Sequence, residues 1–340
     1  MRNYRLLYFL YVCLILTVSC TNHSETILKH TFFRMDTIIE VVLTSQKSFR
    51  PDSVWLSIDS ILKDWEERFS ISNGKSEIKR INERTNDTVP ISKDLGEMIQ
   101  FALNYGDTLS GSFDFTILPL KEIWGLSEDS PENAPVPTMR QIDSVCSLID
   151  YREVSINSTH DTLFFLSPLT KVDIGGVAKA FAMKRVETLL IKRGINNYLV
   201  NAGGDIIGRG KKPDGSSWTI GIQNPRESDK VLATFHLDKG SVFTSGDYER
   251  FRMIDGKRVH HIFNPHTGFS CTGNQSVTIY GSDPVKNKFL STGLFCRSAD
   301  SIIAFVSKYS EIECLVVDSS GKVYISNRWK DKLELVENDR

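Results

Sequence analysis

The sequence lacks a large net charge of either sign. Its 340 residues contain 41 Lys and Arg against 42 Asp and Glu, which gives a formal net charge of -1 at pH 7. Such a balance provides no general attraction to nucleic acid or to acidic surfaces, so we expect no nucleic-acid partner. An anionic ligand must therefore be bound locally. With 40% hydrophobic residues, the chain can bury the core of one large domain or two modest ones.

Cysteine motifs are also absent. Beyond the N-terminal segment the chain contains Cys146, Cys271, Cys296 and Cys314, which are far apart and form no CxxC pair. The sequence therefore predicts neither a zinc site nor a CxxC redox centre. We expect these cysteines to be buried small apolar residues. One disulfide in an oxidising compartment is the alternative, and its pairing does not follow from the sequence.

The N-terminal apolar run is too short to span a membrane. Arg2 and Arg5 precede a 13-residue run from Leu6 to Val18 that is apolar except for Thr17, whereas a spanning helix needs roughly 20 apolar residues. This pattern is typical of a secretory signal. The following LTVSC resembles a bacterial lipobox, although Thr17 replaces the usual Leu. We expect residues 1–20 to be a lipoprotein signal peptide and Cys20 to be lipidated, which would anchor an exported protein to the membrane, facing the periplasm or the outer surface. Plain secretion is the alternative.

The rest of the chain has no internal repeat and no long low-complexity tract. Apolar residues recur at helical spacing over residues 53–69, 92–109 and 176–192. Runs rich in β-branched and aromatic residues predict strands, at 40–44, 162–166, 198–202, 218–222, 233–237, 276–280 and 314–318. Residues 127–140, rich in Pro, Ser and Glu, predict a surface loop. Because helices and strands are interspersed, we expect an α+β domain on a largely antiparallel sheet.

Two glycines and one lysine stand together in VDIGGVAKAFA, at residues 172–182. Gly175 and Gly176 fall at the expected start of a helix, where unpaired amides and the helix dipole attract anions. Lys179 adds a full positive charge in the first turn. The pattern predicts a cradle for a diphosphate, with a tight packing turn as the alternative. A second glycine pair, in LVNAGGDI, suggests close backbone approach to a nucleotide, although the dinucleotide fingerprint GxGxxG is absent.

Several motifs, taken in order, resemble the FAD:protein FMN transferase family, also called the ApbE family. They are the two glycine motifs together with GSFDFTILPLKEIWG at 111–125, TSGDYERF at 244–251 and HHIFNPHTG at 260–268. The resemblance implies that residues 21–340 form a single ApbE-like, T-fold-like α+β domain. It also implies a transferase for protein flavinylation, which splits FAD, attaches FMN to a Thr or Ser of an exported or membrane flavoprotein subunit, and releases AMP.

The resemblance also implies roles for individual residues. His261 matches the expected general base, and Ile262 matches a position against the flavin nucleotide. Asp173 and Lys179 match the acid and the lysine that flank the diphosphate. Further cofactor contacts match Met35, Ser112, Phe113 and Asp114. Structural alternatives are core packing for Met35 and Phe113 and a turn acid for Asp114. His260 and His261 should point to opposite faces of an extended segment, so only one of them can face the site.

The magnesium pattern departs from the family. The resemblance implies a Mg²⁺ ion held by the carbonyl of Gly176, by Thr292 and by an acid on the segment before that threonine. Lys288 stands at the position of the acid, and no carboxylate lies between Asp283 and Thr292. Exchanging a carboxylate for an ammonium should weaken or abolish the metal site, while the lysine could bring its own charge near the phosphates. Asp283 would reach the site only after a rearrangement of its loop.

Two alternative functions use the same residues. The first is a lipoprotein that binds FAD without transferring it, such as a flavin carrier, and the second is an FAD pyrophosphatase with water as the nucleophile. The presence of His261 favours the transferase, whereas the loss of the acid at position 288 favours the binding protein.

The lipid anchor can be tested by expression in a bacterial host. The wild-type protein should sediment with membranes after processing, because a diacylated cysteine holds it there. The Cys20→Ser variant should become soluble or remain unprocessed, as measured by immunoblots of the membrane and soluble fractions. An unchanged membrane fraction of the variant would contradict lipidation at Cys20.

Overall fold

The computed structural model describes residues 25–46, 48–127, 130–131 and 133–336, and Cys20 with the predicted signal peptide lies outside them. The described part is built around one sheet of eight strands in which every neighbouring pair is antiparallel. In spatial order the strands are β1 (Glu25–Arg34), β2 (Thr37–Gln46), β6 (Tyr198–Ala202), β7 (Asp205–Arg209), β10 (Lys239–Gly246), β13 (Asn274–Gly281), β14 (Ile312–Asp318) and β15 (Val323–Ile325).

Both faces of this sheet are buried. On β10, Phe243 belongs to a large core and Val242 to a smaller one, and on β14 Val316 and Leu315 divide in the same way. This alternation follows from strand geometry, in which successive side chains point to opposite faces. A second antiparallel sheet closes the smaller core, and it consists of β8 (Trp218–Gln223), β9 (Val231–Leu237) and β16 (Leu333–Leu335).

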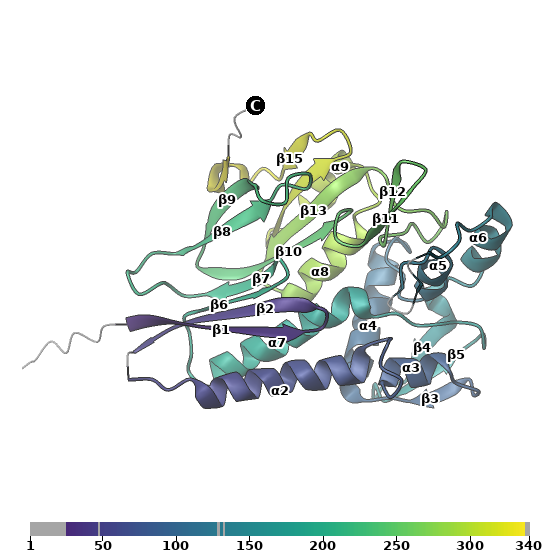
Figure 1. Cartoon of the computed structure of the whole chain (residues 1–340), viewed down its shortest axis with the longest axis horizontal. Helices are drawn as coiled ribbons and strands as arrows, with labels where there is room; N and C mark the ends of the chain where they lie inside the picture. Colours follow the sequence, from purple (N-terminus) through teal and green to yellow (C-terminus); the bar gives the residue numbers. More distant parts are fainter. Residues whose placement is uncertain (1–24, 47, 128–129, 132, 337–340) are drawn as a thin grey trace, which may run out of the picture.

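Helices cover the other face, which carries the large core. The main ones are α2 (Asp52–Phe69), α4 (Lys93–Thr108), α7 (Gly175–Lys192), α8 (Pro284–Gly293) and α9 (Ala299–Val306). Figure 1 shows α2 and α7 side by side below the hairpin of β1 and β2. Val177, Phe181 and Met183 of α7 are all buried in the large core, and this packing fixes where the helix begins. Over the described ranges, none of the helices combines the length and the apolar character needed to cross a membrane.

The remaining elements are short, and several gather at one end of the molecule (Figure 1). The remaining elements are α3 (Glu77–Asn82), α5 (Leu118–Ile123), α6 (Met139–Cys146), the small sheet of β3 (Thr88–Pro90), β4 (Val154–Ile156) and β5 (Thr162–Phe165), the hairpin of β11 (Phe251–Ile254) and β12 (Lys257–His260), and the 3-10 helices Tyr151–Glu153 and Lys330–Lys332.

The predicted α+β fold on an antiparallel sheet is confirmed. The three predicted helices match α2, α4 and α7 to within one residue at each end, and the seven predicted strand segments fall in strands, except that Leu166 lies just beyond β5. The predicted loop at 127–140 is too long, because its last two residues belong to α6. There Thr138 and Gln141 form a capping box that starts α6 at Met139, because each side chain satisfies a backbone amide of the other residue.

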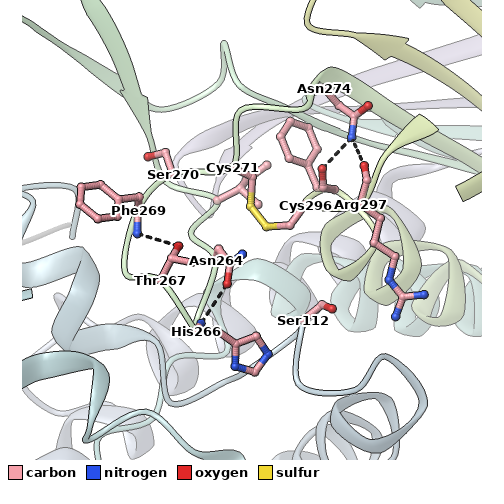
Figure 2. The surroundings of a disulfide bond; sticks show 12 residues. Ser112, Asn264, His266, Thr267, Phe269, Ser270, Cys271, Asn274, Cys296 and Arg297 are labelled. Atoms are coloured by element: carbon pink, nitrogen blue, oxygen red, sulfur yellow. Dashed lines mark hydrogen bonds between the residues drawn. A yellow bond between two sulfur atoms is a disulfide. The ribbon is translucent and has the colours of Figure 1, made fainter. Parts of the chain in front are cut away.

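One disulfide joins two segments that are distant in the sequence. Cys271 follows β12 and its loop, Cys296 follows α8, and their Cα atoms lie 5.0 Å apart (Figure 2). Cys314 is buried and Cys146 is half-buried, and both are free thiols. The expectation that all four cysteines are only buried small residues is therefore wrong for this pair. The apolar character of cysteine could not predict this disulfide, because the pairing depends on how two segments that are distant in the sequence meet in the fold.

The disulfide should stabilise the fold measurably. It closes a loop with a sequence separation of 25 residues, and in the chain-entropy model a loop of this size contributes about 3 to 4 kcal/mol. A variant with both Cys271→Ser and Cys296→Ser should lose about that free energy of unfolding in urea titrations under oxidising conditions. Cys146→Ser is the control, and it should change the unfolding free energy little. A loss below about 1 kcal/mol in the double variant would contradict this estimate.

Candidate functional site

A cleft of about 690 Å³ opens where the central sheet, α7, α8 and the loop after β12 meet. This volume lies within the usual range of ligand pockets, roughly 300 to 1,000 Å³. Every site residue expected from the sequence lines the cleft, namely Met35, Ser112, Phe113, Asp114, Asp173, Gly176, Lys179, His261, Ile262, Lys288 and Thr292. The structure thus brings all of them together, while their individual roles stay predictions.

His261 is held in the tautomer that a general base needs. Its backbone amide donates to the carbonyl of Arg250 at 3.0 Å, and its ring Nδ1 lies 3.2 Å from the same oxygen. A carbonyl only accepts, so Nδ1 carries the proton and the lone pair of Nε2 is left available. Burial lowers the pKa of His261 well below its ordinary value of 6.5, and the charges of Lys121 and Lys288 lower it further. The imidazole is therefore neutral at pH 7.

The neighbouring His260 has a different environment. It is buried, its Nε2–H donates to the carbonyl of Cys271 at 2.7 Å, and its Nδ1 accepts from the amide of Ile262 at 3.3 Å. Burial lowers the pKa of this histidine too. Both ring nitrogens are used to hold the loop, and only His261 lines the cleft, as expected for neighbouring residues of an extended chain.

The start of α7 is organised by Asp173. One carboxylate oxygen accepts from the amide of Gly175 at 2.8 Å, and the other lies 2.5 Å from the Nζ atom of Lys121. The Asp173 side chain is 2% exposed, so its carboxylate is committed to these two partners. Asp173 thus holds the Lys121 ammonium near the positive end of the helix, and its own negative charge is the anion that makes a cation favourable there.

The two glycine pairs differ in what surrounds them. A Cβ atom at Gly175 would lie 3.1 Å from Asp173 Oδ1, whereas at Gly176 it would meet nothing within 4 Å, which leaves the helix start open to the cleft. The second pair forms the tight turn between β6 and β7, with φ values of +59° and +90°, and a Cβ at Gly203 would lie 2.4 Å from Thr37 Oγ1. Close approach is thus found at Gly203, where the neighbour is Thr37 of the β1–β2 hairpin, whereas a Cβ at Gly204 would meet nothing within 4 Å. The approach of a nucleotide to this pair stays a prediction.

The other candidate cofactor contacts have local structural partners. Asp114 accepts from the amide and hydroxyl of Thr116 at 2.7 and 2.6 Å and from the amide of Tyr151 at 2.9 Å. These are the contacts of a turn acid, and burial nevertheless raises the pKa of its carboxyl group. Phe113 packs edge-on against Phe289 of α8, with ring centroids 4.7 Å apart. Phe113 is therefore part of the large core and also lines the cleft.

Met35 and Ser112 line the cleft from two turns. Met35 and Asp36 form the turn between β1 and β2 with φ values of +55° and +54°, a conformation that residues other than glycine rarely adopt. The amide of Met35 donates to Glu66 Oε1 at 2.6 Å, which ties the turn to α2. The hydroxyl of Ser112 donates to the carbonyl of Leu109 at 2.8 Å.

Two lysines converge on one buried carboxylate, that of Asp205. Lys179 Nζ lies 2.9 Å from Asp205 Oδ2 and donates to the carbonyl of Ala202 at 2.9 Å, while Lys288 Nζ lies 3.7 Å from the same Asp205 oxygen. Sequence reasoning did not select Asp205. The only signal was its place after the second glycine pair in LVNAGGDI, and the contact with Lys288 depends on α8 packing against β10, the strand next to β7.

The residues present do not fit a magnesium site of the expected kind. Thr292 Oγ1 lies 3.1 Å from Ser245 Oγ, and the side chain at position 288 brings an ammonium into the cleft, where Mg²⁺ requires oxygen ligands. Asp283 instead caps α8 by accepting from the amide of Val285 at 3.0 Å. In the part of the chain that the structure covers, no three His, Cys, Asp or Glu side chains are grouped to hold a metal ion.

Comparisons of the sequence and of the structure with known proteins all indicate the same family. The model of the ApbE family matches residues 35–316. The FAD:protein FMN transferase of Haemophilus influenzae is 29% identical over 283 residues, which cover 82% of this chain and 80% of that protein. The corresponding transferase of Vibrio cholerae is 28% identical, covering 80% and 82%. The ApbE protein of Thermotoga maritima superimposes with a TM-score of 0.83 at 29% identity, covering 90% of this chain and 99% of that one. The chain therefore belongs to the ApbE family.

Proposed function

We propose that this protein is an FAD:protein FMN transferase, which moves FMN from FAD to a threonine or serine hydroxyl of an acceptor flavoprotein and releases AMP. The observation that carries the proposal is the contact of His261 Nδ1 with the carbonyl of Arg250, which leaves the Nε2 lone pair available in a cleft that also contains three lysines. Its relatives carry the same activity in their names. The cleft supplies a base and cations, which are the two requirements of phosphoryl transfer from a diphosphate.

The reaction assigns a task to each group. The acceptor hydroxyl oxygen attacks the phosphorus on the FMN side, and its proton passes to Nε2 of His261. As the new P–O bond forms, the bond to the bridging oxygen breaks, and AMP leaves with that electron pair. Lys121 and Lys179, both placed by the start of α7, provide positive charge for the diphosphate. Open space at Gly176 lets the phosphates approach the helix start.

A protein that binds FAD without transferring FMN is the second candidate. The ammonium of Lys288 in place of an acid supports this candidate. Weaker stabilisation of the AMP leaving group slows FMN transfer more than it weakens FAD binding. Hydrolysis of FAD uses the same base with water in place of the acceptor hydroxyl. Release of AMP in the absence of any acceptor distinguishes hydrolysis from transfer.

We also propose that the protein acts outside the cytoplasm, anchored by a lipid on Cys20. The lipobox-like LTVSC supports this proposal. The disulfide between Cys271 and Cys296 supports it independently, because disulfides persist in exported proteins and are rare in a reducing cytosol. The acceptor is then an exported or membrane-bound flavoprotein subunit.

Removal of the base tests the proposed function. His261→Gln should lower the rate of FMN transfer by roughly 10²- to 10⁴-fold, because the hydroxyl loses its proton acceptor, while the affinity for FAD should change little. The rate is measured by flavin fluorescence of an acceptor subunit in denaturing gels. The control is His236→Gln, which alters an exposed histidine on β9. If the His261→Gln variant transfers FMN within about threefold of the wild-type rate, His261 is not the base.

The pH dependence of transfer should reflect the lowered pKa of His261. A base is active when unprotonated, and this histidine stays unprotonated in the free enzyme down to a pH well below 6.5. The acidic limb of kcat/KM for FAD should therefore fall below pH 6.5. Bound FAD adds negative charge and raises the pKa of the imidazole, so the acidic limb of kcat should lie at a higher pH than that of kcat/KM. Rates measured from pH 5 to 8 that place both limbs together above pH 6.5 would exclude this assignment.

A further inference from the structure

We propose that Lys288 is a built-in cation that binds the diphosphate of FAD and makes a divalent metal ion unnecessary for FAD binding. The inference rests on the proposed function for the identity of the ligand. Its own basis is the position of the Lys288 ammonium, which comes from α8 and enters the same cleft as Lys179 and His261. Lys288 lies four residues before Thr292, so both side chains project from one face of the helix.

The two ammonium groups outnumber their shared counter-ion. Lys179 and Lys288 both approach Oδ2 of Asp205, whose side chain is 3% exposed. This oxygen accepts no well-oriented hydrogen bond from either lysine in the described structure, so the contacts are ionic and incomplete. One carboxylate cannot neutralise two ammonium ions, and a surplus charge removed from water is costly unless it is paired. An anionic ligand in the cleft would complete the pairing.

Two further charged groups of the cleft, Lys121 and Glu249, leave this surplus in place. Lys121 is already paired with Asp173. Glu249 lines the same cleft, but within the described ranges it forms no ion pair with Lys179 or Lys288. Burial raises the pKa of the Glu249 carboxyl group, although both lysines oppose that change. Glu249 is therefore a weaker counter-ion than Asp205, and the diphosphate is the group that the two ammonium ions can share.

Lys288 is the lysine that is free to turn towards the phosphates. Lys179 is held twice, by Asp205 at 2.9 Å and by the carbonyl of Ala202 at 2.9 Å, whereas the contact of Lys288 with Asp205 is 3.7 Å long. The Lys288 side chain is 14% exposed, so its ammonium has left most of its water already. A flexible four-carbon stem allows it to move from the carboxylate to a phosphate oxygen without moving α8.

The experiment measures FAD binding by calorimetry with the full chain, in excess chelator and in excess MgCl₂. The wild-type Kd should differ by less than about twofold between the two conditions, because the protein supplies the cation. Lys288→Met should weaken FAD roughly 10- to 100-fold, and MgCl₂ should not restore the affinity. Lys288→Asp should bind FAD weakly in chelator and recover in MgCl₂. Lys286→Met is the control, since this lysine of α8 pairs with Glu311.

A second variant separates Lys288 from a metal site built around Asp205. Asp205→Asn keeps the shape of the side chain and removes the charge that competes for the two ammonium ions, so the FAD affinity in chelator should be unchanged or higher. Thermal unfolding of each variant verifies that the fold is retained. A folded Asp205→Asn variant that loses FAD more than tenfold would overturn the proposal, because Asp205 would then be part of the binding site itself.

The outcomes distinguish the two proposals. A wild-type protein that binds FAD only when magnesium is present would overturn the role of Lys288 and leave the transferase proposal standing. The same holds for a folded Lys288→Met variant whose affinity in chelator equals that of the wild type. If the wild-type protein binds no FAD under either condition, the proposed function fails, and the inference about Lys288 fails with it.

Discussion

The arrangement of the cleft depends on where α7 begins. The helix is buried under the central sheet, so its first turn cannot shift without disturbing the large core. Asp173 accepts from the amide of Gly175 and holds Lys121, while Lys179 reaches from the first turn of α7 to the end of β6 and to Asp205. The packing of one helix therefore sets the positions of two cations, and it directs the open helix start into the same space.

His261, the proposed base, and Lys288, the cation of α8, lie on two segments that the disulfide joins. His261 precedes the loop that ends at Cys271, and Lys288 and Thr292 lie on the helix that leads to Cys296. His260, which donates to the carbonyl of Cys271, ties the loop from within. Catalysis of phosphoryl transfer depends mainly on the relative position of the reacting groups. A covalent bond between the two segments is a direct way to hold that position, and it connects the proposed export of the protein with its chemistry.

The sequence was a good guide to elements and a partial guide to contacts. Helical spacing and β-branched runs located α2, α4, α7 and the main strands because these signals are local. The family motifs located residues that the fold brings to one cleft. The partners of those residues were not predicted, because they are distant in the sequence. Asp173 meets Lys121 across 52 positions, and Asp205 on β7 meets Lys288 on α8. Asp114 shows the opposite limit, because a residue in a family motif can spend both carboxylate oxygens on backbone and turn contacts.

The proposed replacement of a metal-binding acid by Lys288 preserves charge and changes geometry. A divalent ion with one carboxylate ligand presents a net charge of +1 to the phosphates, and a single ammonium presents the same +1. Ground-state attraction for the diphosphate can therefore survive the exchange. A metal ion also fixes its ligands in a defined geometry, whereas an ammonium on a flexible stem does not. Leaving-group stabilisation depends on that geometry more than binding does. The substitution should consequently separate two properties that a metal site keeps together, tight FAD binding and fast release of AMP.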